Sequence, residues 1–168
     1  MDFHHLLTQE FVGTTVPALF LEASSRYSDR VAVRWRDGSG EQSLAWRQVQ
    51  ERIFNLSIQL KKLGVVAGDR VAVMAANSPH WVWLDMAVSC LGAHTVPSYP
   101  TTAVAKLPKL FKAVDCKAIA LGDLSVRRDG DHEAVTDWFT ENDFAIRLAL
   151  PKGPNSWKNV DALSTQEH

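Results

Sequence analysis

The chain has few cysteines and no long hydrophobic run. Its two cysteines, Cys90 and Cys116, show no CxxC or CxxH spacing, which indicates a reducing compartment and excludes a disulfide-stapled scaffold. No apolar run reaches the roughly 18 residues of a membrane span. Residues 1–10 carry two histidines instead of the basic and apolar regions of a signal peptide. We therefore expect no transmembrane segment and a cytoplasmic location.

The chain also lacks an excess of charge of either sign. Lysine and arginine total 18 and aspartate and glutamate 19, for a net charge of −1. This balance offers no field to attract nucleic acid, so we expect no nucleic-acid partner. The 46% hydrophobic content is typical of a folded protein, and 168 residues fit one domain or part of a larger one. We expect one unit over residues 1–168, with flexible ends at 1–14 and 164–168.

Sequence motifs of catalysis are missing as well. The chain contains no GxGxxG, GxxxxGK[ST], GxSxG or HExxH, so it has neither a phosphate-cradling loop nor a nucleophile elbow nor a zinc helix. The triplet from Asp131 to Glu133, with His132 between them, could supply metal ligands. Adjacent helical residues point about 100° apart and cannot converge on one ion, so a solvated face is the favoured interpretation. We predict no catalytic, cofactor-binding or metal-binding residue in this chain.

A few side chains remain as weaker candidates. His80 and His94 stand at the predicted start of a helix and of a strand, where a structural role is favoured over catalysis. A basic stripe could contact phosphates but is more typical of a solvated helix face. Its members are Lys106, Lys109 and Lys112.

Tryptophan, in contrast, is abundant, with six residues. Trp81 and Trp83 lie two positions apart, so a helix directs them to different faces. We expect one to pack inward and the other to meet a neighbouring element or subunit. Without a basic groove, a platform for stacking nucleic-acid bases is the less favoured interpretation.

Hydrophobic periodicity predicts four main helices, over residues 15–27, 46–63, 78–91 and 131–141. In the second of these, apolar residues recur every three or four positions and Gly64 follows as a C-terminal cap, but Ala45 is a poor N-cap. Another helix around Leu107 to Val114 is interrupted by Pro108. A weak final turn is expected over 157–163, after a loop that begins at Pro151.

The predicted strands alternate with these helices. Residues 31–36 and 41–44 flank the turn residues 37–40, which indicates a β-hairpin. Residues 71–75 form a continuous apolar run, typical of a parallel strand covered on both faces. Further strands are expected over 94–97, 117–121 and 144–150. The fold class is therefore α/β, with a mainly parallel sheet flanked by helices and a short N-terminal β-hairpin.

The segment from Gly68 to Asn77 leads into and out of the buried strand. Gly68 can adopt a left-handed turn, Asp69 can accept bonds from nearby amides, and Asn77 and Ser78 can cap the next helix. A strand end that feeds a helix is where α/β folds bind ligands. The same residues also serve architecture alone, and that interpretation is favoured.

Several short motifs occur in an order that resembles a known family. They occupy residues 43–49, 60–64, 68–73, 77–81, 85–87, 92–93 and 96–102. In this order and spacing they resemble the N-terminal segment of AMP-forming acyl-CoA synthetases, in the adenylate-forming superfamily. The Tyr-Pro-Thr at Tyr99 to Thr101 looks most like the long-chain fatty acid branch. The likeness covers residues 15–121 and fades beyond Asp123.

The resemblance implies an activity for a complete enzyme, and it implies that this segment lacks the catalytic residues for that activity. Such enzymes join a carboxylate to ATP and pass the acyl-adenylate to coenzyme A, so ATP, Mg²⁺, coenzyme A and a fatty acid are implied for a complete enzyme. In such enzymes the phosphate loop and the catalytic residues follow the segment that this sequence resembles, so none of them is carried onto residues 1–168. We expect a partial N-terminal domain that is inactive alone, and that self-associates or joins the missing C-terminal remainder through an exposed apolar edge. The alternatives are a standalone non-catalytic interaction or regulatory module with this fold and, less favoured, an unrelated small α/β binding protein.

Overall fold

The computed structural model describes residues 15–127 and 130–165 of the chain. The N-terminal end that we expected to be flexible, 1–14, lies outside the described residues. Of the C-terminal end, Ser164 and Thr165 belong to the last helix, and Ser164 is fully buried.

Five parallel strands form the central sheet, in the order β4-β3-β5-β6-β7. In chain order they are β3 (Arg70–Met74), β4 (His94–Ser98), β5 (Ala118–Leu121), β6 (Ile146–Ala149) and β7 (Lys158–Asn159). A separate antiparallel hairpin pairs β1 (Val31–Asp37) with β2 (Gly40–Ala45). The predicted hairpin and parallel sheet are confirmed.

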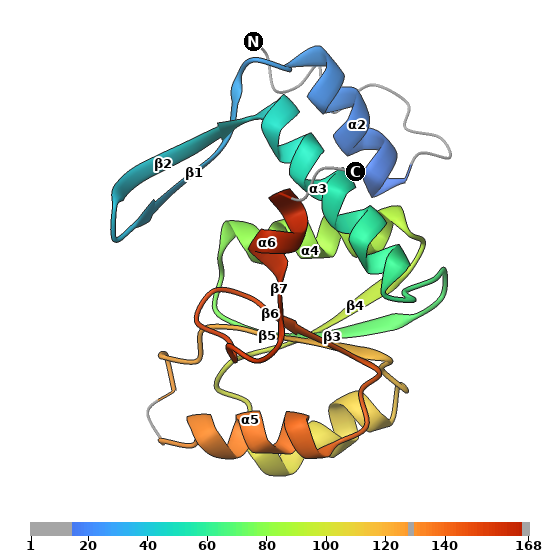
Figure 1. The fold of residues 1–168 in the computed structure, drawn as a ribbon, viewed down its shortest axis with the longest axis vertical. Helices are drawn as coiled ribbons and strands as arrows, with labels where there is room; N and C mark the ends of the chain where they lie inside the picture. Colours follow the sequence, from blue (N-terminus) through green and yellow to red (C-terminus); the bar gives the residue numbers. More distant parts are fainter. Residues whose placement is uncertain (1–14, 128–129, 166–168) are drawn as a thin grey trace, which may run out of the picture.

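Helices cover both faces of the sheet (Figure 1). One face carries α2 (Val16–Arg26), α3 (Trp46–Lys62), α4 (Pro79–Cys90) and α6 (Val160–Thr165), and the other carries α5 (His132–Glu141). The segment between β4 and β5 lies beside α5 and consists of two short turns, η1 (Val104–Lys106) and η2 (Pro108–Lys112). None of the helices within the described ranges is both long and apolar enough to span a bilayer.

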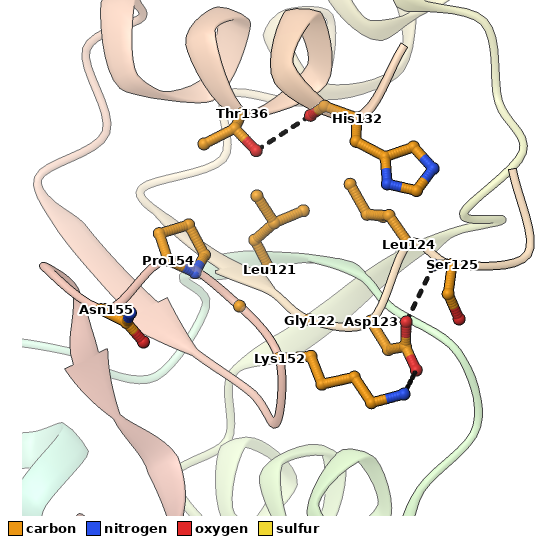
Figure 2. Close-up of a pocket in the computed structure, with 11 residues that line it drawn as sticks. Leu121, Gly122, Asp123, Leu124, Ser125, His132, Thr136, Lys152, Pro154 and Asn155 are labelled. Atoms are coloured by element: carbon orange, nitrogen blue, oxygen red, sulfur yellow. Dashed lines mark hydrogen bonds and ion pairs between the residues drawn. The ribbon is translucent and has the colours of Figure 1, made fainter. Parts of the chain in front are cut away.

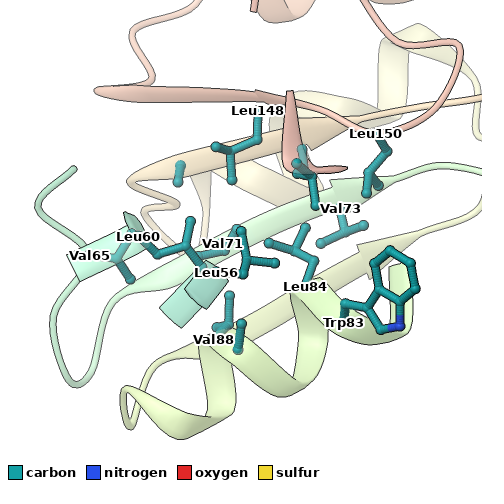
Figure 3. Packing of buried hydrophobic residues seen from close by; sticks show 14 of the residues in the cluster. Leu56, Leu60, Val65, Val71, Val73, Trp83, Leu84, Val88, Leu148 and Leu150 are labelled. Carbon is teal, nitrogen blue, oxygen red and sulfur yellow. The ribbon is translucent and has the colours of Figure 1, made fainter. Parts of the chain in front are cut away.

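The strand β3 explains why the fold has two cores. Its side chains alternate between the faces, so Val71 and Val73 pack under α3 and α4 while Ala72 and Met74 join the core under α5. Figure 3 shows the first of these cores, where Leu56 and Leu60 of α3 meet β3 and α4. Both layers exclude water, which is why this strand reads as an uninterrupted apolar run.

Local chemistry fixes the helix boundaries. The Thr15 hydroxyl accepts a hydrogen bond from the Ala18 amide at 3.3 Å, and the Ser78 hydroxyl accepts one from the Trp81 amide at 3.2 Å. At the start of α3, Ala45 provides no side-chain cap, as predicted, but its own amide donates to Gln48 Oε1 at 2.9 Å.

Two local predictions were incomplete. The segment around Pro108 forms one 3-10 turn and one π-helical turn instead of an α-helix, because proline lacks the amide of a regular helical ladder. The C-terminal stretch was expected to be a loop with a weak turn, yet it contains strand β7 and helix α6. A two-residue strand is too short to show any hydrophobic period, so the sequence gives no signal for it.

Candidate functional site at the carboxyl edge of the sheet

The carboxyl ends of the parallel strands form one edge of the sheet, and β3 and β5 lie at its switch point. From β3 the chain crosses one face through α4 to reach β4, and from β4 it crosses the other face to reach β5. The loops after β3 and β5 therefore diverge, which opens a crevice at this edge. In the described residues, three adjacent hollows lie at this edge, and the smallest shares residues with the two larger ones.

The first large hollow has a lining of mixed polarity and a volume of about 400 Å³. It lies between the end of β5, helix α5 and the loop after β6 (Figure 2). Across its mouth Lys152 Nζ donates to Asp123 Oδ2 at 2.6 Å, while the Ser125 amide donates to Asp123 Oδ1 at 2.8 Å. The Asp123 carboxylate is thus held on both oxygens, and it fixes the loop after β6 to the loop after β5.

These contacts change the acid–base behaviour of Asp123. The bond from Lys152, followed by the bonds from Ser125, lowers the pKa of Asp123 to about 2. Because the folded-state pKa lies below the ordinary value, the stabilisation is present above pH 4 and is lost as pH falls toward 2. We expect Lys152→Met to raise the pKa of Asp123, as measured by NMR titration of the carboxyl carbon. Lys109→Met, an exposed lysine elsewhere, is the control, and an unchanged Asp123 titration in Lys152→Met would contradict the assignment.

Two glycines let backbone segments approach closely under this hollow. A Cβ at Gly122 would lie 2.8 Å from the Cβ atoms of Ala75 and Leu150. A Cβ at Gly153 would lie 2.1 Å from the Leu121 carbonyl oxygen. Only glycine fits at these positions, so the three strand ends converge here without room for a side chain.

The second large hollow is an apolar groove of about 460 Å³ beside the ends of β3 and β4. Trp81 and Tyr99 contribute aromatic rings to its lining, and Tyr99 is 82% exposed. Within the described part of the chain, no charged side chain lines this groove. The groove is therefore suited to uncharged, apolar surface.

A buried arginine holds the wall of this groove. The side chain of Arg127 is 0% exposed, and its Nη1 donates to the carbonyl oxygens of Pro100 and Thr102, each at 2.8 Å. Its Nη2 lies 3.7 Å from an oxygen of Asp131. Arg127 therefore fastens the loop after β4 to the loop after β5.

The structure places most of the candidate residues suggested by the sequence on the surface. Asp131, His132 and Glu133 are all exposed, and no group of three His, Cys, Asp or Glu residues in the described ranges is arranged to hold a metal ion. His132 lines the first large hollow. The basic stripe on η1 and η2 is exposed, as predicted: Lys106, Lys109 and Lys112.

The two histidines have different surroundings, and the two tryptophans face different sides as expected. His80 Nε2 lies 3.3 Å from Asp161 of α6, and burial, only partly offset by Asp161, lowers the pKa of His80. His94 is exposed at the start of β4. Trp83 is buried and contacts Trp35 edge to face, whereas Trp81 is half-buried beside the groove. One tryptophan therefore packs inward and the other meets a neighbouring element.

The cysteines and the Gly68 turn have structural surroundings too. Burial raises the pKa of Cys90 and raises that of Cys116 to about 11, so both thiols are protonated at neutral pH. Gly68 has φ of +82°, and Asp69 Oδ2 accepts a bond from the Val66 amide at 2.8 Å. These bonds shape the turn before β3 at the amino end of the sheet, whereas Asn77 and Ser78 at the other end of this segment line the hollows at the carboxyl edge.

Sequence reasoning missed Asp123, Lys152 and Arg127. The first two are 29 positions apart and the third bonds 25 and 27 positions back, so no local motif joins these partners. One signal was available. The end of a predicted strand is followed by Gly122-Asp123 in one case and Pro151-Lys152-Gly153 in another, and strand ends of a parallel sheet converge on one edge.

Comparison with known proteins identifies the family. Residues 20–159 match the AMP-binding enzyme family. The chain is 32% identical over 109 residues to "Protein Y" of Streptomyces griseus, which covers 65% of this chain and 34% of that protein. It is 30% identical over 107 residues to the long-chain-fatty-acid–CoA ligase heimdall of Drosophila melanogaster, covering 61% of this chain and 16% of the ligase. The matched part of the chain thus spans about a third of the first relative and 16% of the second.

Another relative is an uncharacterized protein of Mycobacterium tuberculosis, 30% identical over 112 residues. The alignment covers 66% of this chain and 64% of that protein, so the two are similar in length.

Solved structures share the fold. A luciferase-like enzyme from the mealworm Zophobas morio superposes with a TM-score of 0.75 at 19% identity, over 95% of this chain and 36% of that one. A putative long-chain-fatty-acid CoA ligase from Rhodopseudomonas palustris gives 0.74 at 19% identity, over 94% and 38%. The predicted partial domain of the adenylate-forming fold is confirmed. With a family match over most of its length, the chain belongs to the AMP-binding enzyme family.

Proposed function

We propose that this chain is the front part of the AMP-binding domain of an AMP-forming fatty acid–CoA ligase. The observation that carries the proposal is the family match over residues 20–159, together with relatives that are named as such ligases. The complete enzyme would activate a fatty acid with ATP and transfer the acyl group to coenzyme A. The chain's own contribution is the parallel sheet whose carboxyl edge opens at β3 and β5.

The residues at this edge do not fit the magnesium–triphosphate group that such chemistry requires. Among the described residues that line the three hollows, Asp123 is the one carboxylate, and Lys152 and Ser125 already engage both of its oxygens. Stabilising a phosphoryl transition state requires a metal held by free acidic groups, together with several donors aimed at the phosphates. We therefore assign no adenylation step to these residues and propose that groups outside this chain bind ATP, Mg²⁺ and coenzyme A.

A second candidate is a standalone, non-catalytic interaction or regulatory module. The relative of similar length in Mycobacterium tuberculosis favours it, because that protein contains a similar segment within a chain of about this length. In this proposal the chain acts in the cytoplasm through a protein partner, a second copy of itself included, and binds no nucleic acid.

One experiment separates the two proposals. An antibody against this segment captures the endogenous protein, whose mass is determined, and the captured material is assayed for fatty-acid-dependent exchange between ATP and pyrophosphate. The ligase proposal predicts a species several times heavier than 18.7 kDa that catalyses exchange, with no exchange by the 168-residue chain alone. A single species of 18.7 kDa without exchange would support the module instead, and exchange by the short chain would contradict our assignment of the chemistry to other residues.

A further inference from the structure

The β1–β2 hairpin has an incomplete sheet. It extends away from the helices (Figure 1), and within the described ranges β1 and β2 pair only with each other. A two-stranded sheet is marginally stable in water, and each strand has an outer edge whose backbone amides and carbonyls pair with no other strand. In β2 the last of these amides, that of Ala45, already donates to Gln48 Oε1. Such an edge is a template for a further strand.

The other sheet edges in the described structure are protected. Edge strand β4 contains Pro97, which has no amide to donate, and the opposite edge strand β7 is only two residues long. Proline and short length are two devices by which natural sheets avoid pairing with another chain. The five-stranded sheet is therefore poorly suited to pairing with a further strand.

The two edges of the hairpin differ from one another. Strand β1 carries the exposed Arg34 and Arg36, and its register with β2 shifts between Val31 and Val33. Charged side chains and a local bulge both discourage pairing. Strand β2 (Gly40–Ala45) has no proline and a single charged residue, Glu41, and its pairing with β1 is regular from Gly40 to Leu44. Its outer edge is thus the unprotected one.

We propose that the outer edge of β2 pairs with β2 of a second copy of this chain, joining two hairpins into a four-stranded antiparallel sheet. The backbone N–H and C=O groups of successive residues point to opposite sides of a strand. In a two-fold antiparallel pair, one residue must therefore lie directly opposite the same residue of the other copy, and the pairing is centred on that residue. Centred on Gln42, the pairing sets Glu41 opposite Ser43 of the other copy. Centred on Ser43, it sets Gln42 opposite Leu44. Neither arrangement opposes like charges.

Charge disfavours several of the competing symmetric arrangements. Centring on Glu41 opposes two glutamates. In β1, centring on Arg34 or Arg36 opposes an arginine with itself, and centring on Trp35 opposes Arg34 with Arg36. Like charges directly opposite one another destabilise a strand pair. The two-fold pairing of β2 also closes on itself, so it yields a dimer and not an open-ended fibre.

This inference goes beyond the ligase proposal and gives a specific partner and surface to the self-association of the 168-residue chain. The test is sedimentation equilibrium of the chain and of four variants: Gln42→Lys, Gln42→Glu, Ser43→Lys and Ser43→Glu. Ser25→Lys, at an exposed site on α2, is the matched control for added charge. Because the pairing is short, the dimer is expected to be weak.

Charge complementation provides the decisive result. With pairing centred on Gln42, each Gln42 variant alone dissociates about fivefold more readily, because like charges meet on the axis, and an equal mixture of the two variants restores association as a heterodimer. With pairing centred on Ser43, the two Ser43 variants behave in this way instead. Ser25→Lys dimerises like the parent chain.

Three outcomes would overturn the inference: a parent chain that remains monomeric, association without an upper size, or a dimer whose dissociation constant is unchanged by all four substitutions. None of these bears on the ligase proposal, which rests on the mass and exchange activity of the endogenous protein. The two ideas therefore fail independently.

Discussion

Replacing Gly153 with alanine is expected to lower the free energy of unfolding by about 3 kcal/mol or more. The new Cβ would lie 2.1 Å from the Leu121 carbonyl oxygen and 2.9 Å from the Leu150 carbonyl oxygen. Both are backbone atoms at the ends of central strands, and the Leu150 amide donates to that same Leu121 oxygen at 2.9 Å. The clash cannot be relieved by a rotamer change, so either the loop after β6 or the strand pairing must move.

Gly38→Ala is the matched control for this prediction. Gly38 lies in the turn of the hairpin, has no positive φ, and a Cβ there meets nothing within 4 Å. Its substitution should change stability by no more than about 1 kcal/mol in either direction. Urea unfolding of the two variants and the parent chain makes the comparison. Equal stability of Gly153→Ala and Gly38→Ala would show that the strand ends do not converge as described.

The sequence predicted those elements whose pattern repeats over several turns or strands. Helix α3 was predicted within one residue of its end because Val49, Ile53, Leu56 and Leu60 form one apolar stripe. Strand β3 was predicted because both of its faces are buried, which removes polar residues from the run. In each case packing imposes a period that a single sequence displays.

The carboxyl edge was not predictable in the same way. Asp123 and Lys152 become partners only because β5 and β6 are neighbours in the sheet, and strand order is not written in local periodicity. Arg127 stands in the sequence beside other charged residues, yet it is buried, and the carbonyl oxygens of two distant residues accept its hydrogen bonds. Contacts of this kind depend on the completed topology. Sequence reasoning therefore identified the family and the scaffold, but not the polar contacts that hold the loops together at the carboxyl edge.

Arg127→Met tests directly whether the hydrogen bonds of Arg127 hold the loop after β4 in place. It keeps much of the side-chain volume but leaves the carbonyl oxygens of Pro100 and Thr102 without their donor. Burying unsatisfied acceptors costs about 1–3 kcal/mol per group, so we expect a loss of about 2–4 kcal/mol in unfolding free energy. Asp131 is 53% exposed in its side chain, so water can solvate it and it should add little.

A surface arginine provides the control for this loss. Arg47 pairs with Asp29 at 3.4 Å, but its side chain is 62% exposed, so Arg47→Met should cost no more than about 1 kcal/mol. Hydrogen exchange gives a second readout, because residues 98–102 should lose amide protection in Arg127→Met while the core strand β3 retains it. Arg127→Lys should fall between the parent and Arg127→Met, since an ammonium group cannot reproduce the planar fork of donors. If Arg127→Met and Arg47→Met are equally stable, the loop after β4 is held by other contacts, and the apolar groove does not depend on Arg127 for its wall.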